Sequence, residues 1–163
     1  MFELIQFQSE GAVMRGRLYR ARGRASSPCI VMTHGTSATI RMVAEDYANV
    51  FNRSGMSVLL YDHRNFGESG GEPRQEAIHG FRHGGIGTPS LSSKHNRKSM
   101  VGRNDEMLHC NRTVQQAVFD KIVAPKMFLE IEGGHFGLLW NPSPLFDEAA
   151  AHQAKFLQEI LGG

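Results

Sequence analysis

Hydrophobic and polar residues follow two different patterns in the first part of the chain. Residues 2–8 and 13–19 alternate between the two kinds, which is typical of strands with one exposed face. The turn signal at residues 9–11 between them predicts an antiparallel hairpin at a sheet edge. Residues 29–35 and 57–62 are instead short, nearly continuous apolar runs. Such runs are typical of strands buried on both faces, so we expect the first of them at the centre of a parallel sheet.

A helix is expected between these two buried strands, over residues 41–53. Its apolar residues recur at helical spacing and would form one buried face; they are Val43, Tyr47, Val50 and Phe51. Gly55 is well placed to end the helix, because glycine readily adopts the left-handed conformation of a C-terminal stop. A strand, a helix and a second parallel strand in this order predict a right-handed crossover unit.

The far end of the chain shows the same kinds of pattern. Residues 113–123 have a helical apolar pattern that ends before Pro125. Residues 127–131 are a short apolar run and predict a strand, and a glycine-rich loop follows it. Residues 145–161 predict a closing amphipathic helix. We therefore expect an α/β fold with a mainly parallel sheet and flanking helices.

The middle of the chain has no such periodicity. Residues 77–100 are rich in Gly, His, Ser and Lys, and their composition is that of a loop or a disordered linker. This divides the chain into an N-terminal part at 1–76, an anomalous linker at 77–100 and a C-terminal part at 101–163.

Composition narrows the partners that we expect. The chain has 163 residues, 40% of them hydrophobic, and its length predicts one domain. The net charge is only +2 and no block of Lys and Arg is long enough for a binding arm, so we expect no nucleic-acid partner. No apolar run is long enough to span a membrane, and residues 1–8 do not resemble a signal peptide.

The two cysteines add little chemistry. Cys29 falls inside a predicted strand and Cys110 is distant from it in sequence, so they show no metal-like spacing. Isolated thiols suit a reducing compartment, and we expect a cytoplasmic protein with no metal and no cofactor.

A polar loop after the second buried run carries the most specific pattern. It reads Asp62-x-Arg64-x-x-Gly67-x-Ser69, and the pair His34-Gly35 stands at the end of the first run. Together with the order of strand, helix and strand, this resembles the N-terminal third of an α/β-hydrolase. The chain is most similar there to fungal members of secondary metabolism, the group of polyketide transferases and toxin-biosynthesis hydrolases.

The resemblance implies a set of site residues. His135, in the loop after the last predicted strand, matches the catalytic base of the family, and Asp105, in the loop at 101–106, matches the acid that orients it. Gly35 and Thr36 match the oxyanion loop, where a backbone N–H stabilises a developing oxyanion. Asp62, with the other residues of its loop, is expected to hold the loop structure rather than to do chemistry.

The family's nucleophile is not recognisable in this chain. A nucleophile elbow places Ser on a sharp turn from a strand to a helix. Ser69, between Gly67 and Gly71, mimics part of such an elbow, but it follows no strand directly and opens no predicted helix. Ser37 and Cys110 are further weak candidates, so the nucleophile stays unassigned. Relative to the family, about three strand–helix units, on the order of a hundred residues, are missing from the centre of the fold.

A shift of reading frame would explain part of the anomalous linker. When residues 77–89 are back-translated with free choice of degenerate bases, the displaced frame can spell a segment that resembles the family's continuation after Glu76. We therefore interpret residues 77–100 as a linker that is either disordered or frame-displaced.

Two functions remain open for the chain as written. One is hydrolysis or transfer of an acyl group, held as an ester or thioester, in polyketide-type secondary metabolism, as the resemblance implies. The other is a catalytically inactive, internally truncated product that lacks the serine nucleophile and has at most a binding role. A small-molecule acyl substrate belongs to the first. A homodimer could cover the strand edges that a shortened sheet exposes.

Overall fold

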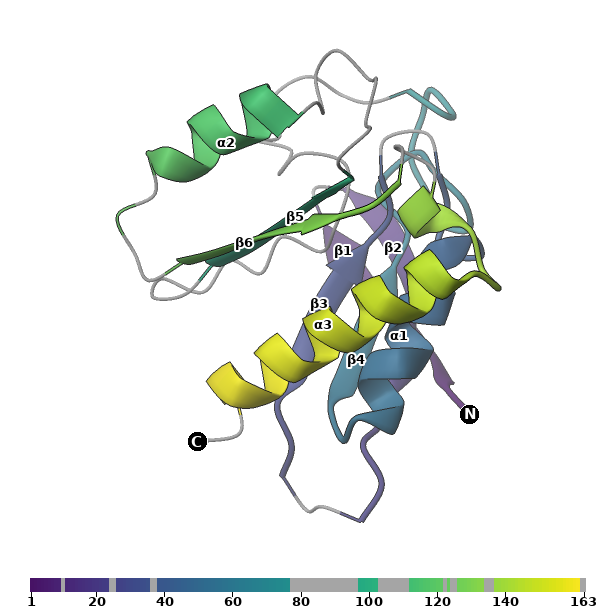
Figure 1. Cartoon of the computed structure of the whole chain (residues 1–163). Coiled ribbons are helices and arrows are strands. Elements are labelled where there is room, and N and C mark those ends of the chain that lie inside the picture. Colours follow the sequence, from purple (N-terminus) through teal and green to yellow (C-terminus); the bar gives the residue numbers. More distant parts are fainter. Residues whose placement is uncertain are drawn as a thin grey trace. The chain divides into compact units, whose positions relative to one another are not determined.

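The computed structural model describes residues 1–9, 11–23, 26–35, 38–76, 97–102, 112–121, 123, 126–133 and 137–161. The chain divides into two compact units, Met1–His83 and Gly84–Gly163. Figure 1 shows the elements of both units along the sequence. No helix in the described part of the chain is long and apolar enough to cross a lipid bilayer.

The first unit is built on a four-stranded sheet with the order β1-β2-β4-β3. Strands β1 (Glu3–Ser9) and β2 (Ala12–Tyr19) form the predicted antiparallel hairpin, and β1 lies at the edge of the sheet. Strand β4 (Ser57–Tyr61) pairs antiparallel with β2 and parallel with β3 (Cys29–Thr33). The sheet is therefore mixed, with the parallel pairing that the crossover pattern predicts.

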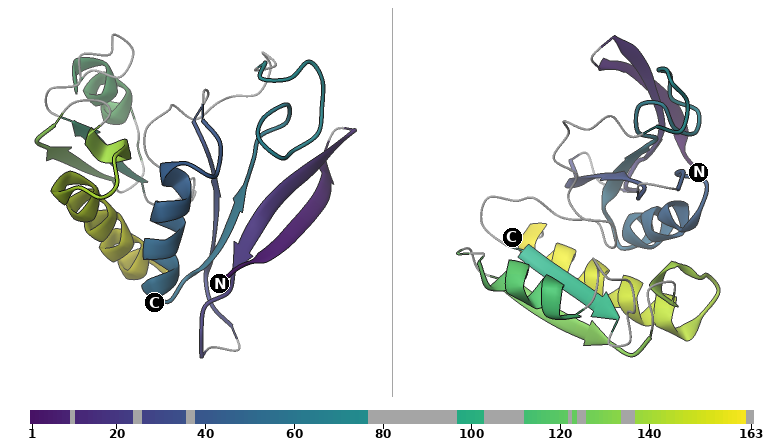
Figure 2. Two further views of the ribbon diagram at one scale, coloured as in Figure 1. Left: turned by 90° about the vertical axis from the view of Figure 1, so that its right-hand side faces the viewer. Right: turned by 90° about the horizontal axis from the view of Figure 1, so that it is seen from above.

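Helix α1 (Val43–Arg53) connects β3 to β4 and covers one face of this sheet (Figure 2). Tyr47, Ala48 and Phe51 of the helix are buried. The alternate residues of β3 and β4 are buried as well; they are Ile30, Met32, Val58 and Leu60. Because side chains on alternate positions of a strand share one face, these residues form the core between helix and sheet.

The end of α1 follows the glycine signal in the sequence. Gly55 has a φ of +89°, in the left-handed region that only glycine adopts without strain. The amide of Ser54 donates a hydrogen bond to the carbonyl of Val50, and that of Gly55 donates to the carbonyl of Asn52. The predicted helix stop is therefore confirmed.

A polar cluster fastens α1 to β2. The Arg17 guanidinium lies 2.5 Å from a carboxylate oxygen of Glu45, and the Tyr19 hydroxyl donates a hydrogen bond of 3.1 Å to the same oxygen. Burial raises the pKa of Tyr19 to about 12, so its hydroxyl stays a donor at neutral pH. A carboxylate with two donors holds the helix in register on the strand.

The expectation that β3 is a central strand buried on both faces was wrong, because β3 is the last strand of the described sheet. Val31 is 62% exposed, and Cys29 on the same face is exposed too. Within the described residues β3 pairs only with β4, and α1 is the single helix of the first unit. An apolar run shows that a strand can be buried on both faces, but only neighbouring elements can cover it.

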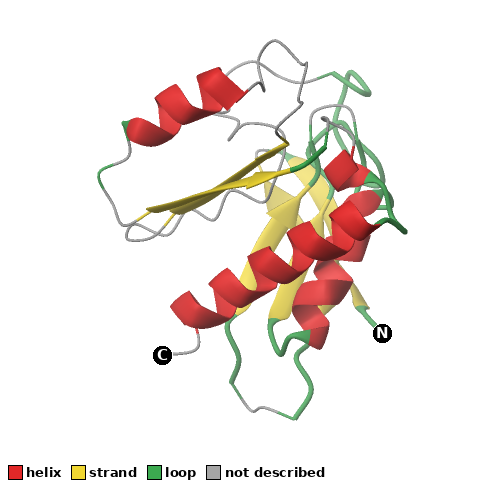
Figure 3. Ribbon diagram, in the orientation of Figure 1, coloured by secondary structure: helices red, strands yellow, loops and turns green. Residues whose placement is uncertain are grey.

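The second unit is built on two parallel strands, β5 (Arg97–Gly102) and β6 (Lys126–Ile131). Helix α2 (Arg112–Asp120) connects them, and a short 3₁₀ turn, η1 (Gly137–Leu139), precedes the closing helix α3 (Pro144–Leu161). Figure 3 distinguishes these helices and strands by colour.

Aromatic and aliphatic contacts hold these elements of the second unit together. The rings of Phe119 on α2 and Phe128 on β6 lie 5.2 Å apart. Ile131 at the end of β6 packs with Leu138 and Ala149. The structure therefore contains the helix, strand and closing helix that periodicity predicts in this part of the chain.

One strand of the second unit begins within the span 77–100, whose composition predicted a linker. Strand β5 begins at Arg97 and therefore takes up the last residues of the span 77–100. The sequence of β5 opens with Arg97, Lys98 and Ser99, which carry no apolar alternation. These residues become a strand because they pair in register with Lys126, Met127 and Phe128 of β6. Pairing with a partner strand therefore overrides weak local preference here.

Two glycines allow a test of how closely β2 and β4 approach. A Cβ at Gly16 would lie 2.4 Å from the carbonyl oxygen of Leu60 and 2.7 Å from Cβ of Tyr61. We expect Gly16→Ala to force the strands apart and to lower the free energy of unfolding by about 2–3 kcal/mol. A Cβ at Gly55 would meet nothing within 4 Å, so Gly55→Ala should cost only the backbone strain, about 1 kcal/mol. Urea unfolding of both variants measures the difference, and equal losses would contradict the close approach.

Candidate functional site

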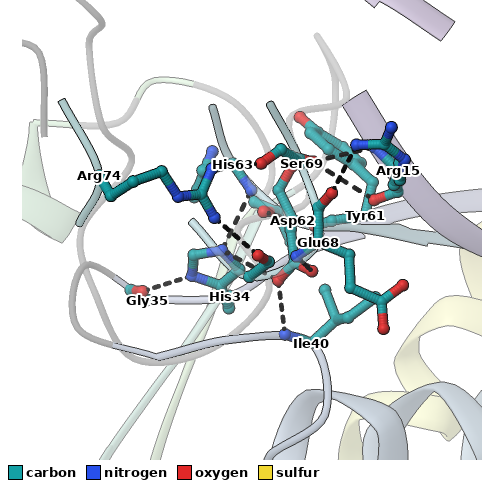
Figure 4. A network of polar contacts seen from close by, with 12 residues as sticks. Arg15, His34, Gly35, Ile40, Tyr61, Asp62, His63, Glu68, Ser69 and Arg74 are labelled. Carbon is teal, nitrogen blue, oxygen red and sulfur yellow. Dashed lines mark hydrogen bonds and ion pairs between the residues drawn. The ribbon is translucent and has the colours of Figure 1, made fainter. Parts of the chain in front are cut away.

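The carboxyl ends of β3 and β4 lie side by side in the first unit. Thr33 pairs with Tyr61 in the parallel register, so the next residues, His34 and Asp62, leave the sheet at the same edge. Polar residues at such an edge are where open α/β sheets place their chemistry. Figure 4 shows the contacts that connect the loops after these strands.

The carboxylate of Asp62 joins the two loops. Its side chain is 1% exposed. Oδ1 accepts a hydrogen bond of 3.0 Å from the amide of Ile40, in the loop after β3, and Oδ2 accepts one of 3.0 Å from the amide of Glu68, in the loop after β4. A buried carboxylate needs such donors, since an unpaired charge in the interior is costly. Asp62 therefore holds both loops in one arrangement.

Gly67 makes room for this carboxylate. Its φ is +50°, and a Cβ at this position would lie 2.2 Å from Oδ2 of Asp62. Only a residue without a side chain can let the loop wrap so closely around the acid. The Asp-x-x-x-x-Gly spacing of the sequence therefore has a physical reason in the loop.

His34 connects the two strand ends through its ring. Nε2 accepts a hydrogen bond of 3.0 Å from the amide of His63, and Nδ1 lies 2.7 Å from the carbonyl oxygen of Gly35. A backbone N–H can only donate and a carbonyl can only accept, so the proton of the ring is on Nδ1 and the ring is neutral. Oδ1 of Asp62 lies 3.5 Å from Nε2, but both atoms are acceptors, so this contact is not an ion pair in the neutral ring.

Ser69 is committed to the same structural network. Residues 67–71 match the letters Gly-x-Ser-x-Gly, yet Ser69 is only 2% exposed. Its Oγ donates a hydrogen bond of 2.7 Å to the carbonyl of Asp62 and accepts one of 2.9 Å from the amide of Arg15. A nucleophile must be exposed to substrate and give its proton to a base, and Ser69 does neither. The structural role that the sequence favoured for this loop agrees with these bonds.

Two arginines and an asparagine complete the loop after β4. Arg15 donates from Nη1 to the carbonyl of Glu68 at 2.8 Å, and Arg74 donates from Nη2 to the carbonyl of Gly67 at 2.7 Å. Asn65 is fully buried with a φ of +71°, and its backbone N–H donates a hydrogen bond of 2.9 Å to the carbonyl of Gly70. The contribution of Arg15 was not predicted from the sequence, because β2 is far from this loop in the chain and only strand pairing brings them together.

Among the predicted site residues, the structure describes only Gly35. Its carbonyl accepts the His34 contact and also a hydrogen bond of 3.1 Å from the amide of Ala38. Thr36, Asp105 and His135 lie outside the described residues, as do the weak nucleophile candidates Ser37 and Cys110. The predicted base, acid and oxyanion donor therefore remain predictions.

The second unit places two other strand ends together. Gly102, the last residue of β5, pairs with Ile131, the last residue of β6, in the parallel register. In sequence, Asp105 follows the first of these residues and His135 follows the second. In the part of the chain that the structure describes, no group of three or more His, Cys, Asp or Glu side chains is arranged to hold a metal ion.

Comparison with known proteins finds that part of this chain is similar to thiohydrolases and polyketide transferases. Over 67 residues, 41% of this chain, it is 51% identical to a thiohydrolase of Aspergillus aculeatus, of which the match covers 20%. It is 37% identical over 78 residues to a polyketide transferase of Penicillium crustosum, which covers 46% of this chain and 25% of that protein. No family model matches the chain.

Two solved structures match the chain almost from end to end. An α/β serine hydrolase homologue from Coxiella burnetii matches 98% of this chain and 97% of its own, with a TM-score of 0.65 and 14% identity. A predicted CIB-like hydrolase from Thermoplasma acidophilum matches 98% and 99%, with a TM-score of 0.69 and 14% identity. The fold is that of the α/β-hydrolases. The sequence matches confirm the resemblance to polyketide transferases and thiohydrolases that the motifs indicated. The matches span only about a fifth to a quarter of the length of these curated relatives.

Ser69 offers a direct test of how the loop after β4 is held. Ser69→Ala removes the acceptor of the part-buried Arg15 amide and the donor to the buried carbonyl of Asp62, so we expect the free energy of unfolding to fall by about 1–3 kcal/mol. We also expect a fluorophosphonate probe, which labels nucleophilic serines, to leave Ser69 of the unaltered chain unmodified. Thermal melts and peptide mass spectrometry measure the two effects. Labelling of Ser69 would show that it is a nucleophile after all.

Proposed function

We propose that this chain hydrolyses or transfers an acyl group held as an ester or thioester, as in polyketide-type secondary metabolism. The observation that carries the proposal is the 51% identity to a thiohydrolase over 67 residues. The loops of the first unit support it, because the ends of β3 and β4 are fixed around Asp62 as a rigid platform would require. Rigid placement of catalytic groups is a main source of enzymatic rate enhancement.

In this proposal His135 is the catalytic base and Asp105 orients it. Support comes from the parallel pairing of β5 and β6, whose last residues, Gly102 and Ile131, are direct partners. Chain segments that leave adjacent parallel strands start at the same edge of the sheet. The base would take the proton of an attacking hydroxyl or thiol, and the carboxylate would stabilise the imidazolium that forms.

The oxyanion donor in this proposal is the backbone N–H of Thr36, presented next to Gly35. The attack of a nucleophile on an acyl carbonyl puts negative charge on its oxygen, and a fixed N–H at that position lowers the barrier. The Gly35 carbonyl is held by His34 and Ala38, which supports a fixed backbone at this strand end. The nucleophile itself is unassigned.

The second candidate function is a catalytically inactive, truncated protein with at most a binding role. One observation favours it: the serine in the Gly-x-Ser-x-Gly letters, Ser69, is buried and committed to the loop. The near end-to-end match to two solved chains shows the fold, and both candidates share that fold.

The proposal also covers the binding partners and the location of the protein. A small-molecule acyl compound is the partner, with neither nucleic acid nor membrane involved and no cofactor or metal required. Cys29 is a free thiol, which suits the cytoplasm. Within the described residues β3 pairs only with β4, and in this proposal a second copy of the chain pairs with its other edge.

Turnover of a simple thioester separates the two candidates. The substrate is an acyl-N-acetylcysteamine thioester with a thiol-reactive dye, and the chains are the unaltered protein, His135→Ala and Ser69→Ala. For an acyl hydrolase we expect the His135 variant to lose at least about a hundredfold in kcat/KM, since general-base catalysis contributes on that order. Ser69→Ala should keep the turnover per folded molecule.

Circular dichroism melts of the same three samples provide the control. If no chain turns over the thioester while all melt cooperatively, the inactive candidate holds and the acyl-transfer proposal is wrong. Fluorophosphonate labelling with peptide mapping would then be expected to mark no serine. If turnover is present and His135→Ala leaves it unchanged, the assigned base is wrong.

A further inference from the structure

The ring of His34 takes part in contacts at the ends of two strands, and the acyl-transfer proposal gives it no task. It is almost completely buried, with a side chain 1% exposed. One ring nitrogen contacts the carbonyl of Gly35 at the end of β3, and the other accepts the amide of His63 at the end of β4. Buried polar groups with both bonds made hold a single geometry.

We infer that His34 is a positioning residue: its neutral ring, protonated on Nδ1, fixes the Gly35 carbonyl by anchoring it to the His63 amide. The inference rests on the proposed function, in which the peptide that follows Gly35 supplies the oxyanion donor. A peptide unit is planar, and its carbonyl and N–H point in opposite directions. Orienting the Gly35 carbonyl therefore orients that donor.

The direction of each hydrogen bond requires this tautomer. The His63 amide has a hydrogen to give, so Nε2 must offer a lone pair, and the Gly35 carbonyl has only lone pairs, so Nδ1 must carry the hydrogen. A proton on Nε2 would point toward the His63 amide and would have Oδ1 of Asp62, 3.5 Å away, as its alternative partner. The bridge between the strand ends therefore exists only in the one neutral form.

The surroundings keep the ring in place from three sides. The His63 ring lies 4.8 Å from the His34 ring at 79°, and the Phe66 ring lies 5.5 Å away. Both Asp62 oxygens are already bonded to the amides of Ile40 and Glu68. Aromatic edges favour a fixed ring orientation, and the two backbone amides hold the Asp62 carboxylate in place beside the ring.

Two substitutions separate the two ends of the bridge. His34→Asn places an amide nitrogen where Nδ1 stands, so it can still donate to Gly35 but is too short to reach the His63 amide. His34→Gln places an oxygen near the position of Nε2, so it can still accept from His63 but has no donor for Gly35. Each variant thus keeps one contact and removes the other.

Amide hydrogen exchange reads out each contact without any need for turnover. In His34→Asn we expect the His63 amide to lose about tenfold or more in protection, while His34→Gln keeps most of it. The amides of Ile40 and Glu68, which are bonded to Asp62, are internal controls and should change by less than about twofold in both variants. Unchanged protection of His63 in His34→Asn would overturn the inference.

The tautomer is tested in the unaltered chain by long-range proton–nitrogen correlation of the histidine rings. The His34 signal is the one that disappears in His34→Asn. We expect a protonated Nδ1 and an unprotonated Nε2 at neutral pH. A proton on Nε2, or on both nitrogens, would contradict the bridge even if a variant failed to fold and lost protection everywhere.

Turnover adds the functional readout and keeps the two proposals apart. If thioester hydrolysis is present, both variants should lower kcat with little change in KM, because oxyanion stabilisation acts in the transition state. Turnover that is retained in both variants would refute the positioning role even with the expected tautomer. If no turnover exists in any chain, the proposed function fails, whereas the tautomer and exchange results still decide whether His34 holds Gly35.

Discussion

A carboxylate removed from water must be surrounded by hydrogen-bond donors, and in this protein that requirement organises the loops at one edge of the sheet. Asp62 is buried and takes one amide from the loop after β3 and another from the loop after β4. The donors are backbone groups, so satisfying the charge fixes the course of the chain rather than the orientation of one side chain. Gly67 and Ser69 then occupy positions set by this carboxyl residue.

In the first unit, the burial of apolar side chains is concentrated on one face of the sheet. On the face that α1 covers, the strand residues Ile30, Val58 and Leu60 are almost completely buried, whereas Val31 on the opposite face is largely open. An apolar strand residue stabilises the fold only to the extent that other atoms remove it from water. The polar network at the strand ends therefore contributes to this unit beside a core built on a single face.

Ser69 shows why a motif must be judged in its structural context. The residues around Ser69 match the sequence motif of a nucleophile elbow, but an elbow works because its turn exposes the serine hydroxyl above the sheet. Here the hydroxyl points back to the carbonyl of Asp62 and the amide of Arg15. The same residue type in the same glycine spacing serves a structural role, because the strand-to-helix turn that would expose it is not there.

Local pattern determined much of this protein from sequence alone. Alternation predicted the hairpin of β1 and β2, helical spacing predicted α1 and α3, and Gly55 marked the end of α1. The strand–loop motif also led to the α/β-hydrolase fold, which the structural comparisons confirm. The hairpin, the helices and the helix stop depend on interactions between residues that are close in the chain, so periodicity and spacing record them, whereas the fold family was implied by resemblance.

Only the tertiary structure decided which faces are covered and which side chains meet. The exposure of Val31, the strand character of Arg97 and the bond from Arg15 to Ser69 all depend on partners distant in sequence. The tautomer of His34 is decided in the same way, by one carbonyl and one amide from different strands. Burial and hydrogen-bond partners are properties of the assembled sheet, and the local pattern of residues does not determine them.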